Sequence, residues 1–128
     1  MIEPGLILDT AAVQAYSRGT NDVGEFLADA ADNDLSVLIP ATCLAVAYQQ
    51  ASDDEWGYID ILAGLPQVVV APLTENFCAV LGDWARTLGL DLAHATIEAV
   101  TRPVVPLMTS QRDLVTRFLP AQWPIIDV

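Results

Sequence analysis

Short, uninterrupted apolar runs recur along the chain, and the segments between them mix polar and apolar residues with helical spacing. Uninterrupted runs of this kind are typical of strands that are buried on both faces, as in a parallel sheet. Strands are predicted at residues 6–8, 37–39, 68–70, 107–108 and 125–126. Because strand and helix follow each other through the whole length, the pattern predicts a single α/β domain over residues 1–128. We expect a mostly parallel five-stranded sheet with helices on both faces.

Five intervening segments have apolar residues at spacings of three and four, as in amphipathic helices. Asp22 is placed to cap the first helix, the polar cluster 52–55 to cap the third, and Thr74 to cap the fourth, which Gly89 ends. The apolar faces of these predicted helices fall within residues 23–30, 41–50, 56–62, 77–88 and 91–101. No internal repeat interrupts this order.

The charge balance is strongly acidic. Seventeen Asp and Glu residues stand against five arginines, with no lysine, and the formal net charge is -12. A domain that binds nucleic acid needs a basic face to neutralise phosphates. Arg102, Arg112 and Arg117 fall in the last quarter of the chain, where we expect scattered surface charge rather than a basic strip. The composition therefore argues against nucleic acid as a partner.

Apolar residues make up 53% of the chain. No window approaches the roughly 18 consecutive apolar residues of a membrane-spanning helix, so no membrane contact is expected. Residues 1–4 lack the basic region and apolar stretch of a signal peptide, and the cytoplasm is the expected compartment. In a reducing compartment, Cys43 and Cys78 are expected to be buried free thiols.

Asp9 is the most informative polar residue, because it directly follows the first predicted strand, where parallel α/β sheets bind their ligands. No glycine-rich phosphate loop follows any strand. A receiver-type phospho-acceptor needs a lysine, which is absent, and a haloacid-dehalogenase-like site needs an aspartate where the chain has Ala11. His94 is the only imidazole, and the chain has no Gly-x-Ser-x-Gly turn, so catalysis by a serine or cysteine nucleophile lacks support. A structural zinc site needs four Cys or His ligands at short paired spacings, which one histidine and two separated cysteines cannot supply.

Four segments in this order resemble the PIN-domain family. They are LILDTAA at residues 6–12, IPATCLAV at 39–46, GLDLAHA at 89–95 and LMTSQRDL at 107–114. The resemblance extends over essentially the whole chain and implies the fold of that family. Its members are small metal-dependent ribonucleases, many of them toxins of bacterial toxin–antitoxin pairs.

The resemblance also implies a site in which carboxylates from separate elements hold one or two Mg²⁺ or Mn²⁺ ions. Asp9 matches the first of these acids and is the one candidate metal ligand. The positions of the other three acids read Val46, His94 and Gln111. We therefore expect a degenerate site without a cofactor, in a pseudo-nuclease kept as a binding or assembly module. His94 is a candidate partner for Asp9 in place of the metal.

If the alignment of these segments with the family's acidic positions shifts by a few residues, an alternative remains open. Asp91 lies three residues before His94, and Asp113 lies two residues after Gln111. Asp9, Asp91 and Asp113 could then form the rearranged catalytic site of a ribonuclease that depends on Mg²⁺ or Mn²⁺. The competing interpretation makes Asp91 and Asp113 helix caps.

The apolar excess, with a mean hydropathy of +0.41, predicts further buried surface in a homodimer or against another protein. Trp56, Trp84 and Trp123 are candidate contact residues, although Trp84 suits the core better. A small ligand in the vacated cleft is a third hypothesis, which rests on the expected cleft alone.

Overall fold

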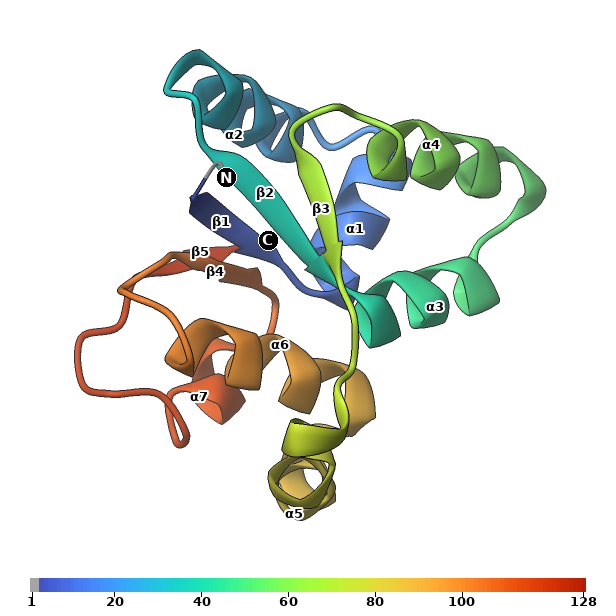
Figure 1. Cartoon of the computed structure of the whole chain (residues 1–128). Coiled ribbons are helices and arrows are strands. Elements are labelled where there is room, and N and C mark those ends of the chain that lie inside the picture. The colour runs from blue at the N-terminus through green and yellow to red at the C-terminus, as the bar shows by residue number, and fades with distance from the viewer. Residues whose placement is uncertain (1–2) are drawn as a thin grey trace.

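The computed structural model describes residues 3–128 and contains one sheet of five parallel strands. The strand order is β3-β2-β1-β4-β5, so the first strand lies in the middle (Figure 1). The strands are β1 (Pro4–Leu8), β2 (Ser36–Pro40), β3 (Val68–Ala71), β4 (Leu107–Thr109) and β5 (Ile125–Asp127). All five predicted strands are confirmed.

Helices cover both faces of the sheet, and successive strand residues point into two hydrophobic cores. Ile7 belongs to one core and Leu8 to the other. The core around Leu8 is covered by α1 (Thr10–Ser17), α2 (Asn21–Asp32) and α4 (Asp53–Ala63). The core around Ile7 is covered by α5 (Cys78–Leu88), α6 (Leu90–Val100) and α7 (Arg112–Val115). Between these layers, α3 (Ala41–Gln50) places Cys43 in the core of Ile7 and Ala47 in that of Leu8.

The helix starts follow the sequence signals in part. Ser52 caps α4 as expected, because its hydroxyl oxygen accepts a hydrogen bond from the Glu55 N–H at 3.2 Å. The expectation that Asp22 caps α2 is wrong, since the helix begins two residues earlier than such a cap requires, at Asn21, and Thr20 holds the cap position. The acidic cluster at the start of α4 is thus a helix N-terminus, where negative charge is favourable.

The segment that leads into α5 also differs from its prediction. Thr74 precedes a short 3-10 helix, η1 (Glu75–Phe77), and its side chain makes no cap hydrogen bond. Gly89 ends α5 as expected, with φ at 79°, a backbone conformation that glycine adopts without steric cost. Gly89 also holds the N-terminal cap position of α6, so α5 and α6 follow each other without a loop.

Three further expectations concern single side chains. Cys43 is buried as predicted, but Cys78 is exposed at the start of α5, and both are free thiols. Trp84 and Trp123 pack against the core of Ile7, whereas Trp56 is 49% exposed. Within residues 3–128, none of the helices combines the length and the apolar character needed to cross a membrane.

Candidate functional site

A cleft of about 300 Å³ opens at the carboxyl ends of β1 and β4, the edge of a parallel sheet where ligands bind. Asp9 follows β1, Ser110 and Gln111 follow β4, and Asp91 reaches the cleft from the first turn of α6. The other lining residues are Thr10, Ala11, Gln14, Leu88, Leu92 and Leu114. Polar side chains from separate elements therefore converge here, and Asp9 lies at the carboxyl end of β1 as the sequence predicted.

Asp9 is 3% exposed and caps α1, because its Oδ1 accepts a hydrogen bond from the Ala12 N–H at 2.9 Å. Burial raises the pKa of Asp9 to about 6, since removal from water disfavours a carboxylate. Hydrogen bonds from Thr109 and Ala12 oppose this rise, and the nearby charge of Asp91 adds to it. Asp9 therefore caps α1, although burial makes its ionised form less favourable than it is in water.

Asp91 is the second acid of the cleft. It lies within the first turn of α6, whose cap position is held by Gly89, so its interpretation as a helix cap is wrong. Its Oδ2 accepts a hydrogen bond from Thr10 Oγ1 at 2.6 Å, and its carbonyl oxygen accepts one from Cys43 Sγ at 3.1 Å. The structure thus brings Asp9 and Asp91 to one cleft, and Thr10 bonds to the second acid rather than to the first.

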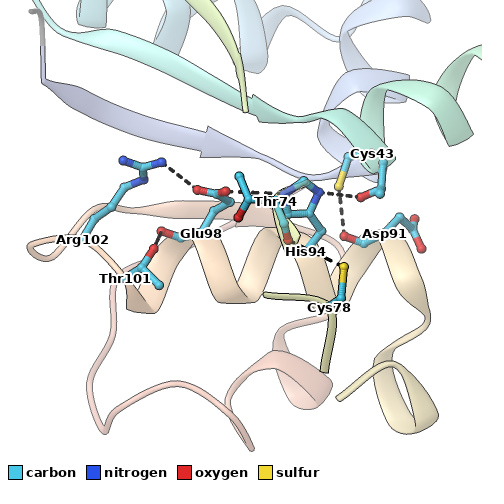
Figure 2. A network of polar contacts seen from close by, with 9 residues as sticks. Cys43, Thr74, Cys78, Asp91, His94, Glu98, Thr101 and Arg102 are labelled. Atoms are coloured by element: carbon cyan, nitrogen blue, oxygen red, sulfur yellow. Dashed lines mark hydrogen bonds and ion pairs between the residues drawn. The ribbon is translucent and has the colours of Figure 1, made fainter. Parts of the chain in front are cut away.

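His94 lies outside the cleft, contrary to the expectation that it pairs with Asp9. Its ring is 0% exposed, with Nδ1 2.9 Å from Thr42 Oγ1 and Nε2 3.4 Å from Glu98 Oε1 (Figure 2). His94 follows Asp91 by one helical turn on α6, and that turn carries the ring beneath the sheet. The histidine is therefore part of the buried interior and not of the cleft.

A row of polar side chains on α6, which the sequence analysis missed, continues from His94. Glu98 is 3% exposed, and its Oε2 accepts a hydrogen bond from Arg102 Nη2 at 2.6 Å (Figure 2). Burial alone would raise the pKa of Glu98, but the His94 ring and the Arg102 guanidinium outweigh it and hold the pKa below its usual range. The available signal was the spacing of His94, Glu98 and Arg102 at intervals of four, the first two in the apolar helix α6 and the third just beyond its end.

The segment after β4 supplies an amide to the cleft and no acid. Gln111 lines the cleft, whereas Asp113 is exposed on α7 and is not among the lining residues. The cap position of α7 is held by Gln111, so Asp113 is not a cap either. The alternative site of three acids is therefore realised only for Asp9 and Asp91.

Val46 is half-buried on α3 and does not line the cleft. It lies one turn before Gln50, and residues four apart share a helix face. The Oε1 of Gln50 accepts a hydrogen bond from Nε2 of Gln14, a residue of the cleft, at 2.7 Å. Position 46 is thus on the side of α3 that borders the cleft, and it offers no polar atom there.

Comparison with known proteins tests the fold. No protein-family model matches the chain, and no curated protein matches it. Among solved structures, one that this chain resembles is the crystal structure of VapBC2 from Rickettsia felis bound to a DNA fragment from their promoter. The TM-score is 0.66 and the sequence identity 15%, over 99% of this chain and 98% of that chain. This chain has a PIN-like fold. The architecture implied by the family resemblance is confirmed, and at this identity the likeness concerns the fold alone.

The PIN-like fold of residues 3–128 contains no group of three His, Cys, Asp or Glu side chains close enough together to hold a metal ion. The cleft supplies two carboxylates, and one oxygen of each accepts a hydrogen bond from the chain itself, from Ala12 for Asp9 and from Thr10 for Asp91. The remaining oxygen and nitrogen atoms of its lining side chains belong to hydroxyls and amides.

Positive charge on the PIN-like domain is scattered and mostly paired, as the composition predicted. Four of the five arginines lie within 4.0 Å of an acidic side chain in the described part of the chain. The pairs are Arg18–Glu55, Arg86–Asp83, Arg102–Glu98 and Arg112–Asp127. Each pair neutralises charge that a phosphate-binding face would need.

Proposed function

We propose that this PIN-like domain binds another protein chain and does not cut RNA. The observation that carries the proposal is the content of the cleft: two carboxylates, Asp9 and Asp91, each with one oxygen held by the chain itself. Metal-dependent hydrolysis needs acids that are free to hold ions and the water that they activate. The cleft is better suited to fix the start of α1 and α6 than to do this chemistry.

The donor set of the cleft fits Mg²⁺ or Mn²⁺ poorly. These hard cations prefer charged oxygen ligands in a near-octahedral arrangement. The cleft offers two carboxylates, Asp9 and Asp91, as charged ligands. Gln14 and Gln111 offer neutral amides. We therefore expect weak binding of divalent ions and no resident cofactor.

The meeting of Asp9 and Asp91 in one cleft favours a second candidate function, a ribonuclease that depends on Mg²⁺ or Mn²⁺. In this case the two carboxylates would be the metal ligands, and Asp113 would contribute none. A carboxylate has two oxygens, so the hydrogen bonds from Ala12 and Thr10 do not prevent Asp9 and Asp91 from holding a cation. Two charged ligands are nonetheless few for a hard cation, which ranks this candidate below the first.

A protein is the class of partner that the surface supports. The net charge is -12, and four of the five arginines are paired with acids, which opposes binding to nucleic acid. The Rickettsia felis neighbour is a VapBC2 complex, which supports a protein partner for a chain of this fold. A homodimer is one form of this proposal.

The direct test is cleavage of fluorescently labelled single-stranded RNA in the presence of MgCl2 or MnCl2. The wild type and Asp91→Asn are expected to give the same background rate, because the cleft of neither protein holds a competent metal site. Asp91→Asn is the matched control, since an amide oxygen can still accept the Thr10 hydrogen bond. Cleavage by the wild type that exceeds this variant by more than about tenfold, a difference of about 1.4 kcal/mol in barrier, would establish the second candidate instead.

A further inference from the structure

A second pocket, of about 520 Å³, lies between the sheet and the C-terminal end of α6. The sheet contributes Leu38 and Ala71, which belong to the core of Ile7. The opposite side contributes Glu98 of α6 and Arg102 just beyond the helix. None of the described residues that line this pocket borders the Asp9 cleft. Sites for small molecules typically enclose roughly 300–1,000 Å³, so this pocket is large enough for a ligand and is separate from the cleft.

The wall that the sheet forms is apolar and partly uncovered. Strand β3 is at the edge of the sheet, so no further strand of the described chain lies beside it. Val69 of β3 pairs in register with Leu38 of β2, and Ala71 follows two residues later, so their side chains share one face of the sheet. Val69 lines the pocket and is 47% exposed. An apolar molecule in the pocket would remove this surface from water, which is favourable.

The wall that α6 forms contains a buried ion pair. Glu98 is 3% exposed, its Oε1 lies 3.4 Å from Nε2 of His94, and its Oε2 accepts the hydrogen bond from Nη2 of Arg102 at 2.6 Å (Figure 2). Both carboxylate oxygens therefore face partners within the chain, which leaves neither free for a cationic ligand. A buried ion pair is often no more stabilising than apolar side chains of the same volume. Stability alone does not account for charged groups beside an apolar pocket.

Arg102 has hydrogen-bond donors to spare. A guanidinium carries five N–H groups, and the acceptor that the described chain gives it is Glu98. Its Nε is buried and has no hydrogen-bond partner among residues 3–128. A buried donor without an acceptor is unfavourable and calls for an explanation. Because the Arg102 side chain lines the pocket and is 31% exposed, a ligand can approach the guanidinium there.

We propose that this pocket binds a small apolar molecule that carries one neutral hydrogen-bond acceptor, such as a carbonyl oxygen, which accepts from Arg102. The apolar body covers Val69 and Leu38. The carboxylate of Glu98 and the net charge of -12 disfavour an anion, and the guanidinium of Arg102 disfavours a cation. This binding activity goes beyond the proposed protein-binding role and does not depend on it.

Fluorescence titration with prodan tests the site, because prodan is a neutral naphthalene with one ketone and its emission shifts to the blue in apolar surroundings. The wild type is expected to give a saturable blue shift with a Kd on the order of 10 μM. Val69→Trp fills the pocket and is expected to weaken binding at least about tenfold. Val80→Trp is the matched control, since this valine is 38% exposed on α5 and does not line the pocket, and it is expected to leave binding unchanged. Excitation beyond the absorption of tryptophan keeps the added rings from contributing to the signal.

A combined variant tests the role of Arg102. Glu98→Leu with Arg102→Met replaces the ion pair by apolar side chains, a change that buried ion pairs often tolerate. This variant is expected to weaken prodan binding at least about threefold, because the ketone loses its donor. Its affinity for N-phenyl-1-naphthylamine, a neutral naphthalene without a carbonyl group, is expected to stay the same. The second probe therefore separates loss of the donor from loss of the pocket.

A wild type that gives no saturable blue shift overturns the proposal without reference to any variant. Binding that survives unchanged in Val69→Trp, or that Val80→Trp weakens equally, overturns it too, because prodan then binds elsewhere. Equal weakening of both probes in the combined variant removes the role of Arg102 as the donor and contradicts the proposed ligand class. The RNA assay decides the proposed function separately from all of these outcomes.

Discussion

Asp9→Asn is expected to stabilise the protein by about 2–3 kcal/mol near neutral pH. The pKa of Asp9 rises from 3.8 to about 6 on folding, mainly because the carboxyl is buried. Each pKa unit corresponds to about 1.4 kcal/mol of difference between the protonated and the ionised form. Asparagine keeps the acceptor oxygen that caps α1 at the Ala12 N–H but carries no charge.

The sign of the pH dependence follows from the direction of this shift. Between about pH 3.8 and pH 6 the folded protein binds the Asp9 proton more tightly than the unfolded chain does, so stability from this group falls as pH rises through that window. Above the window the ionised carboxylate destabilises the fold by its full amount. The advantage of Asp9→Asn is therefore expected to be complete above about pH 7 and to disappear below about pH 4.

Urea unfolding of the wild type and Asp9→Asn across this pH range measures the difference directly. Asp113→Asn, at an exposed acid that does not line the cleft, is the control. If Asp9→Asn destabilised the protein by a pH-independent amount, the carboxylate would be stabilising in its charged form. That outcome would show that the hydrogen bonds to Asp9 outweigh the cost of burying its charge.

Arg102→Met is expected to destabilise the protein by about 3 kcal/mol. The guanidinium holds the Glu98 carboxylate at 2.6 Å, and that carboxylate has a side-chain exposure of 4%. Removal of one member of a buried ion pair leaves a buried charge without compensation, which typically costs about 3–5 kcal/mol. The side chain of Arg102 is 31% exposed, so water can replace part of it and the lower end of this range applies.

Two further variants make the Arg102 measurement specific, again by urea unfolding. Arg102→Met combined with Glu98→Gln is expected to recover at least half of the loss, because the buried charge is gone. Arg86→Met breaks the exposed pair with Asp83 and is expected to change stability by less than about 0.5 kcal/mol. Equal effects of Arg102→Met and Arg86→Met would show that burial of Glu98 does not govern the energy of the polar row.

The strands could be predicted from the sequence, whereas helix α1 could not. A strand with both faces buried leaves a continuous apolar run, as Val37 to Ile39 does in β2. Helix α1 has the cap residue Asp9, but it has no acidic residue in its first turn and no basic residue in its last, so its further end signals are absent. Helix α1 packs against α3 and α4, which lie far from it in the sequence, so a local pattern could not predict its position.

Asp9 could be predicted as a residue of the cleft from its position after β1. The sequence alone could not decide whether Asp91 or His94 is its neighbour there. Asp91 and His94 both lie near the start of α6, one turn apart, which is about 4.5 Å along the helix axis. The order of residues does not say how far α6 projects beyond the strand ends. The contact between Thr10 and Asp91, across 81 positions, settles the choice in the folded chain. Burial of His94 with Glu98 likewise depends on the depth of α6 beneath the sheet.

Titration of the wild type with MnCl2 by isothermal calorimetry tests most directly whether the cleft is a metal centre. Binding is expected to be absent or millimolar, because two internally bonded carboxylates hold a hard cation weakly. The combined variant Val46→Glu and Gln111→Asp, which introduces one acid beside the cleft and one in its lining, is expected to bind at least about tenfold more tightly. Micromolar binding by the wild type that is lost in Asp9→Ala would contradict the non-enzymatic role.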